Sequence, residues 1–273
     1  MPFDTAKHDR LLRDIWKREF PNEAFELPSS RWTLIGFQGR DPCTDLRGSG
    51  IIALHHLQAF LLSSNRAVLY SLLPPTNSPL TEFPLSIASI NCTAMLLSHF
   101  QLAPQLALAF LPGARVDVSR CNLTGFLSLG DAVADNNLDE DEDEAIAARV
   151  RLLERALAVM HERLLLRLAQ FWAHMLETNP ATTIMDFSVA LRRTYAVLKC
   201  ACSRMGRAPW NLSTLASTFD TCDSKQSPSP DPLFICVVGA TSPLCLSYVQ
   251  VSNVQRNHPG MYGGSHLTLS SML

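Results

Sequence analysis

The sequence of 273 residues lacks an excess of either charge, since 23 Lys and Arg residues stand against 25 Asp and Glu residues and leave a formal net charge of −2. A protein that binds nucleic acid through phosphate contacts normally presents a basic face, so no nucleic-acid partner is expected. The hydrophobic content of 47% is typical of a globular protein with a core. The length fits one large domain, or one medium domain with an appendage.

The first 20 residues contain no apolar stretch, because charged side chains alternate through them, so the pattern of a secretory signal is missing. We therefore expect a cytoplasmic protein whose eight cysteines are reduced and lie in or near the core. No C-x-x-C pair typical of a zinc site occurs, so no metal site is predicted. One long uncharged stretch exists at residues 233–251, but Gly239 and Pro243 interrupt it, which favours a buried hairpin over a membrane span.

Common enzyme signatures are missing as well. The sequence has neither a phosphate-binding P-loop nor a G-x-S-x-G nucleophile elbow. His161 and Glu162 begin like the zinc-protease motif, but its second histidine is replaced by Leu165, so we expect His161 on the surface of a long helix. His55 and His56 would point about 100° apart on a helix, which is unsuitable for one metal ion and predicts ordinary polar-face histidines.

A loose G-x-G-x-x-A dinucleotide pattern is present at Gly48, Gly50 and Ala53. A true example follows a strand and meets an acidic residue about 20 positions later that binds the ribose. Neither feature is apparent, so a nucleotide-dependent oxidoreductase is the weakest of the functional alternatives.

What the sequence does contain is helical periodicity. Apolar residues recur every three or four positions through most of the first two hundred residues, which predicts an all-α fold. The helices are expected at about residues 5–19, 50–64, 84–100, 144–177 and 183–202. The fourth would run for about nine turns and is the longest.

Two regions depart from this periodicity. A loop over about residues 112–143 ends in the acidic run 138–144, which predicts a solvated insert, with a role in steering a partner as the alternative. Near the C-terminus, residues 224–232 are typical of a linker, and strand-like runs follow at 233–238 and 244–251. The second region therefore predicts a short extension that contains a β-hairpin.

The segment from Trp32 to Gly50 packs four glycines, a proline, two aromatic residues, two acids and two arginines into 19 residues. Fixing each glycine costs backbone entropy, so an ordered loop of this composition usually holds a side chain in place. Arg47 follows Asp45 by two residues, and its guanidinium could be presented to an anion on a partner. It could equally form a salt bridge with Asp45 or Asp41 that only stiffens the loop.

This segment and its continuation to Phe60 resemble the signature of the ELMO (engulfment and cell motility) domain. The shared elements are Trp32, Gly36-Phe37-Gln38, Pro42, Thr44-Asp45, Arg47-Gly48, Gly50 and the Leu54-x-x-Leu57 repeat. Two weaker resemblances follow in order at residues 83–97 and 185–187. We therefore predict an ELMO domain over residues 5–203 with the acidic insert at about 112–143, and a linker and C-terminal extension of unknown fold at 204–273.

The resemblance implies an all-helical domain and, for the small members of the family, GTPase-activating activity towards Arf and Arf-like small GTPases. Arg47 occupies the position of the family's catalytic arginine, which is supplied in trans. The residues expected to shape this loop or contact the GTPase are Trp32, Gly36, Phe37, Gln38, Asp41, Pro42, Thr44, Asp45, Gly48 and Gly50.

The same resemblance sets expectations for cofactors and partners. GTP and Mg²⁺ would be bound by the partner GTPase, so the chain would need no cofactor of its own. Without a membrane span, any recruitment to a membrane would be peripheral and would come through the GTPase. The alternative function is a non-catalytic adaptor that binds a small GTPase or a cell-motility factor through the same surface.

Overall fold

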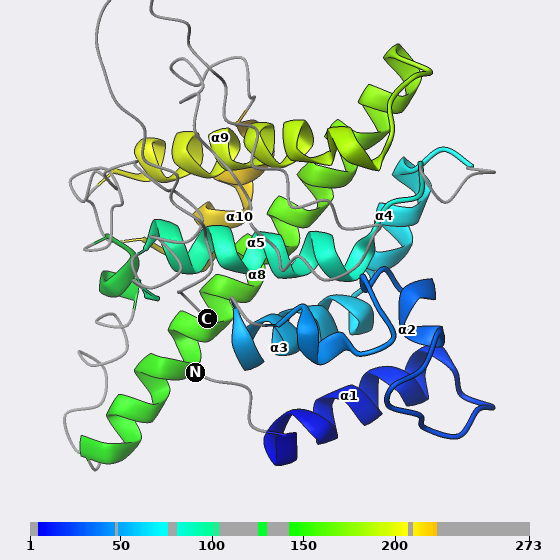
Figure 1. Cartoon of the computed structure of the whole chain (residues 1–273). Coiled ribbons are helices and arrows are strands. Elements are labelled where there is room, and N and C mark those ends of the chain that lie inside the picture. Colours follow the sequence, from blue (N-terminus) through cyan, green and yellow to red (C-terminus); the bar gives the residue numbers. More distant parts are fainter. Residues whose placement is uncertain are drawn as a thin grey trace, which may run out of the picture.

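The computed structural model describes residues 5–46, 49–75, 81–100, 102–103, 125–129, 142–206 and 210–222. The regular elements of these ranges are helices, which confirms the all-α fold class (Figure 1). They are α1 Thr5–Glu19, α2 Arg31–Leu34, η1 Pro42–Thr44, α3 Gly50–Leu62, α4 Asn65–Leu72, α5 Leu85–His99, α8 Glu142–Thr178, η3 Ile184–Asp186, α9 Phe187–Met205 and α10 Leu212–Thr221. Within the described residues, no helix is long and apolar enough to cross a membrane.

The five helices expected from periodicity correspond to α1, α3, α5, α8 and α9, while α2, α4 and α10 were not predicted. Most of the region expected as an acidic insert lies outside the described residues, as do the linker at 224–232 and the strand-like runs. Within the insert region, residues 125–129 are helical, and Phe126 stacks on Phe100 with ring centroids 4.6 Å apart. This part of the expected loop therefore contributes to the core.

Helix α5 is the centre of the packing, because all fifteen of its residues are buried. It contacts α3 on one side and α8 on another, and α8 crosses α3, α5 and α9 diagonally (Figure 1). The helix carries no Asp, Glu, Lys or Arg, but it does bury several hydroxyl and amide groups. Two of these groups bond within the helix: Asn91 donates to the Ile87 carbonyl at 2.9 Å, and the Thr93 hydroxyl donates to the Ser89 carbonyl at 3.2 Å, whereas the buried Ser98 hydroxyl has no hydrogen-bond partner among the described residues.

Two histidines meet inside the core, contrary to the expectation that both would lie on polar surfaces. His161 of α8 is 1% exposed and His56 of α3 is buried, and their rings lie against each other with centroids 4.7 Å apart and planes tilted by 32°. Both rings reach α5: His161 Nε2 lies 2.9 Å from the Ser89 hydroxyl, and His56 Nδ1 lies 2.9 Å from the Thr93 hydroxyl. Sequence reasoning treated both as ordinary surface residues, whereas each lies on the buried face of its helix.

Burial sets the protonation state of this pair. It lowers the pKa of His56 from 6.5 to about 4, with a smaller effect from neighbouring His55. It also lowers the pKa of His161 well below 6.5, and the proximity of His56 adds to this effect. Both imidazoles are therefore neutral at pH 7, and the hydroxyl groups of α5 supply their hydrogen-bonding partners.

Helix α10 extends the core beyond residue 203, where the sequence analysis placed the end of the domain. Its Leu215 and Phe219 are buried against α8 and α9. Trp210 precedes the helix and packs edge-on against Phe100 and Phe126. Asn211 caps the helix by accepting a hydrogen bond from the Thr214 amide at 2.8 Å.

The N-terminus of α5 is closed by the chain that follows α2. The first amide groups of a helix have no partner within it, and at a buried end they need acceptors from elsewhere. The Ile35 carbonyl accepts from the Ser86 amide at 3.1 Å, and the Gly36 carbonyl accepts from the Ile87 amide at 3.2 Å. Gly36 has φ +88°, and a Cβ built there would lie 2.7 Å from the Pro84 carbonyl carbon.

Gly36→Ala is therefore expected to destabilise the fold by about 2 to 5 kcal/mol. The left-handed backbone conformation is strained for alanine, and its Cβ also collides with the start of α5. Gly39→Ala is the matched control, since a Cβ there meets nothing within 4 Å. It should change stability by less than about 0.5 kcal/mol. Urea unfolding of both variants measures the difference, and equal stabilities would contradict the close approach.

The histidine pair predicts a loss of stability on acidification. The unfolded chain binds a proton at His56 with a pKa near 6.5 and the folded chain only near 4, so the stabilisation is complete above pH 6.5 and is lost as the pH falls towards 4. At pH 4 the loss from His56 would be about 3 kcal/mol. The unfolding free energy can be measured with urea at each pH across this range. It should change less steeply with pH for His56→Gln than for the exposed control His55→Gln. Equal pH dependence of the two variants would show that folding does not lower the pKa of His56.

Candidate functional site

The chain between α2 and α3, residues 35–49, is called the α2–α3 loop below, and it rests on a cluster of aromatic rings. Trp32 is 0% exposed, and its ring lies 5.7 Å from Phe37 and 5.1 Å from Trp16 of α1. Its indole N–H donates to the Glu26 carbonyl at 3.1 Å. Phe25 packs edge-on against the same ring, so Trp32 is surrounded by aromatic side chains and fixes the start of the loop.

The middle of the loop is a single turn of 3-10 helix that Asp41 caps. Its carboxylate accepts a hydrogen bond from the Cys43 amide at 2.9 Å, and its carbonyl accepts one from the Thr44 hydroxyl at 2.8 Å. Pro42 is buried at the first position of this turn, where its lack of an N–H costs nothing. Burial, aided by Asp41, raises the pKa of the Cys43 thiol to about 12, so this sulfur stays protonated at neutral pH.

Asp45 connects the two ends of the loop. It is 3% exposed, and its carboxylate accepts a hydrogen bond from the Gln38 amide at 2.9 Å and a longer one from the Thr44 hydroxyl at 3.4 Å. A carboxylate buried this deeply needs such donors, because it has lost its water. The bond to Gln38 closes the loop between residues seven positions apart in sequence.

Arg47 and Gly48 lie outside the described residues, but both of their neighbours are placed. Leu46 is buried, and its carbonyl accepts from the Gly50 amide at 2.8 Å. The Ser49 hydroxyl donates to the Ile90 carbonyl of α5 at 3.3 Å. Gly50 has φ +56° and begins α3, a backbone conformation that favours glycine. The segment that carries Arg47 therefore spans two points that are fixed to the helical core.

The structure thus brings most of the expected site residues into one loop. Phe37 packs on Trp32, the Gly36 carbonyl joins the loop to α5, and Asp41, Thr44 and Asp45 brace it by hydrogen bonds. Sequence reasoning missed several of the partners, because the carbonyls of Glu26, Ile35 and Ile90 are backbone atoms without a side-chain signal. Trp16 of α1 also belongs to the support of the loop and was not predicted, although its spacing of four from Leu12 places it on the buried face of the helix.

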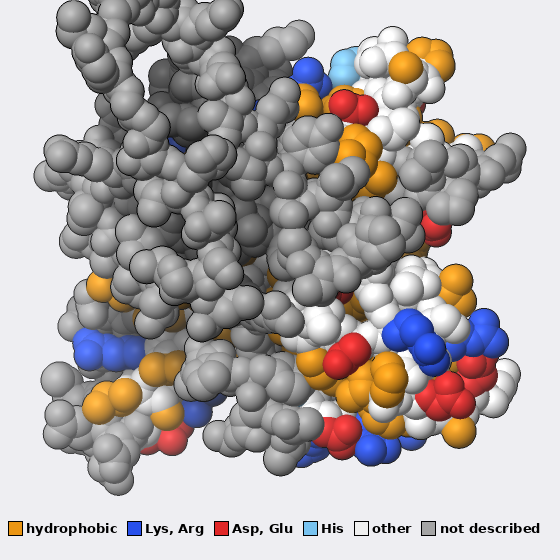
Figure 2. All heavy atoms as spheres, in the orientation of Figure 1, with side chains coloured by type: hydrophobic (Ala, Val, Ile, Leu, Met, Phe, Trp, Pro, Cys, Tyr) orange, Lys and Arg blue, Asp and Glu red, His pale blue; other side chains and the backbone are white. Residues whose placement is uncertain are grey.

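The surface around the loop is mixed in charge. On the face shown in Figure 2, acidic, basic and hydrophobic side chains alternate over the region occupied by α1 and α2 in Figure 1. Ion pairs join Arg13 to Asp9 at 2.6 Å and Arg31 to Glu23 at 2.8 Å. Among the residues that the structure describes, no group of three or more His, Cys, Asp or Glu side chains could hold a metal ion.

Comparison with known proteins identifies relatives through short matched segments. "Ankyrin repeat and ELMO domain-containing protein D" of Dictyostelium discoideum is 32% identical over 94 residues, which are 34% of this chain and 7% of that protein. Human "ELMO domain-containing protein 2" is 33% identical over 96 residues, or 35% of this chain and 32% of that protein. Human "ELMO domain-containing protein 1" is 45% identical over 58 residues, or 21% of this chain and 17% of that protein.

The matched segments span about a third or less of the length of these relatives. No solved structure matches the chain. A sequence model of the ELMO/CED-12 family matches residues 1–191, which is more than half of the 273 residues. The chain therefore belongs to the ELMO/CED-12 family.

Proposed function

We propose that this chain accelerates GTP hydrolysis by a small GTPase of the Arf family, and that Arg47 enters the partner's active site as an arginine finger. The observation that carries the proposal is the placement of the residues on either side of Arg47. Leu46 and Ser49 are both held to the helical core, so the two-residue segment between them starts and ends at fixed points.

The chemistry explains why such a support matters. A GTPase alone hydrolyses GTP slowly because negative charge develops on the phosphate oxygens with too few fixed cations nearby. A guanidinium supplied by a second protein neutralises this charge and raises the rate by about 10³- to 10⁵-fold. The gain depends on a preorganised arginine, because any freedom that the arginine retains must be lost in the transition state.

The buried bracing of the α2–α3 loop supplies this preorganisation. The buried rings of Trp32 and Phe37 pack tightly under the loop. The Asp45 hydrogen bond to Gln38 joins two parts of the loop that are seven residues apart in sequence. Gln38, Asp41 and Thr44 are half-buried, so each retains surface that a partner can contact while it holds the loop. GTP and Mg²⁺ belong to the partner in this proposal, and association with a membrane would come through that GTPase.

Arg47→Lys is expected to lower GTPase activation by on the order of 10³-fold while the melting temperature changes little, because lysine keeps the charge but lacks the planar fork that contacts two oxygens. Single-turnover GTP hydrolysis by a panel of Arf and Arf-like proteins, with and without the chain, measures the rate. Arg40→Lys is the matched control, since Arg40 is an exposed arginine of the same loop and should leave the rate unchanged.

Two outcomes would contradict this assignment. If the Arg47 variant still binds the GTPase and the wild-type chain does not accelerate hydrolysis by any member of the panel, the chain is an adaptor. If the variant instead melts many degrees lower, Arg47 forms an internal ion pair that stiffens the loop.

Trp32→Ala should abolish activation by a different route, because it removes a ring that is 0% exposed from the aromatic cluster. The expected cost is about 3 to 5 kcal/mol of unfolding free energy. Leu34→Ala serves as the control on the same helix, since Leu34 is 61% exposed and should change stability by less than about 0.5 kcal/mol. A Trp32→Ala chain as stable as the control would show that the ring does not support the fold.

A further inference from the structure

Two cysteines on different helices lie thiol to thiol at the end of α10. Cys200 belongs to α9, and Cys222 is the residue that follows the last turn of α10. The two side chains are neighbours where α10 packs on α9, and both are free thiols. Cys222 is 1% exposed, whereas Cys200 is half-buried and retains access to solvent. The two residues do not form a C-x-x-C motif, so their pairing was not predicted.

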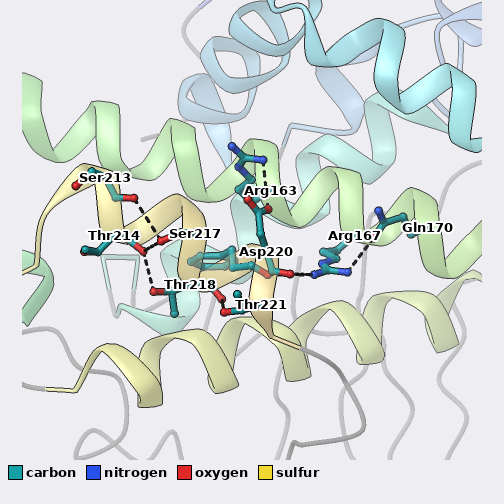
Figure 3. A network of polar contacts seen from close by, with 10 residues as sticks. Arg163, Arg167, Gln170, Ser213, Thr214, Ser217, Thr218, Asp220 and Thr221 are labelled. Atoms are coloured by element: carbon teal, nitrogen blue, oxygen red, sulfur yellow. Dashed lines mark hydrogen bonds and ion pairs between the residues drawn. The ribbon is translucent and has the colours of Figure 1, made fainter.

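Arginines hold the end of α10 in this position. Arg167 of α8 donates to the Asp220 carbonyl at 2.5 Å, and Arg204 of α9 donates to the Thr221 carbonyl at 3.1 Å. Arg163 of α8 pairs with the Asp220 carboxylate at 3.2 Å. Figure 3 shows Asp220 between Arg163 and Arg167, with the last turn of α10 against α8.

The register of α9 directs both groups to the same place. Arg204 follows Cys200 by one helical turn, so the two side chains share a face of the helix. While Arg204 binds the Thr221 carbonyl, Cys200 faces Cys222, the next residue of the chain. The bonds that dock α10 therefore also keep the two thiols next to each other.

The surroundings give the two thiols different reactivity. Burial, aided by Cys200, raises the pKa of Cys222 to about 11, although the positive charges of Arg204 and Arg167 act against this rise. Cys222 is thus a neutral and shielded thiol at pH 7. Cys200 is the more accessible thiol, so an oxidant reaches it first. Cys222 lies next to it and can react with the oxidised sulfur.

We propose that Cys200 and Cys222 are a redox modification site at which a peroxide forms a disulfide between α9 and α10. The Cys200 sulfur attacks one oxygen of hydrogen peroxide, the O–O bond breaks, and the released hydroxide takes the thiol proton to leave as water. The Cys222 sulfur then attacks the resulting sulfenic acid, the S–O bond breaks, and the leaving hydroxide takes the Cys222 proton as a second water. Two thiols are oxidised and one peroxide is reduced, with no other reactant.

The test treats the reduced full chain with hydrogen peroxide, blocks the remaining thiols under denaturing conditions and maps the peptides by mass spectrometry. We expect a cross-linked pair containing Cys200 and Cys222, with the loss of two hydrogens. Cys200→Ser and Cys222→Ser should both abolish this product. Cys43→Ser is the matched control, because Cys43 is also half-buried and free, and it should leave the product intact.

A second measurement is independent of the mapping. The disulfide closes the chain between α9 and the end of α10, so the oxidised wild-type chain should melt at a higher temperature than the reduced one, and Cys200→Ser should show no such difference. A cross-link that maps to another pair of cysteines would overturn the proposal. So would oxidation of Cys200 to sulfinic acid while Cys222 remains a free thiol.

Discussion

The N-terminus of α5 is the point on which the rest of the structure depends. An uncharged helix with all fifteen residues buried cannot leave its first amide groups in water, so other parts of the chain must supply acceptors. The carbonyls of Ile35 and Gly36 do so, and the close approach requires that residue 36 lack a side chain. The α2–α3 loop is therefore held by the same bonds that complete the central helix, and the proposed site is part of the core rather than an appendage to it.

The core buries several polar groups that hydrogen-bond with one another or with the backbone. Ser89 and Thr93 of α5 bond to backbone carbonyls or to the paired histidines, so two imidazoles can be buried in the neutral form. Leucine in place of either histidine would leave a hydroxyl of α5 without its imidazole partner, which offsets part of the gain from a more apolar side chain. This arrangement makes the packing of three helices sensitive to acid.

Periodicity was enough to predict the helices of three or more turns, including α8, whose two ends both lie within two residues of the expected positions. It failed for α10 because the segment from Leu212 to Thr221 is rich in Ser and Thr and has only two buried large side chains. It also failed for His161, which was judged by residue type although it follows Met160 and precedes Leu164 and Leu165 on the buried face of α8. At the proposed site, the resemblance singled out the α2–α3 loop, but no residue pattern could show which backbone carbonyls hold it.

Within the loop, some residues are proposed to act through packing and Arg47 through the partner. This difference determines which substitutions can separate an effect on activity from an effect on stability. Trp32 and Gly36 act through packing, so their loss would remove activity and stability together. Arg47 is expected to act on the partner alone, so its loss should separate the two. Asp45 belongs to both groups, because its buried carboxylate closes the loop onto Gln38 and it also precedes Arg47 by only two residues. A change at Asp45 would shift the arginine and weaken the fold at once, and for this reason a catalytic role can be argued from Arg47 but not from its neighbour.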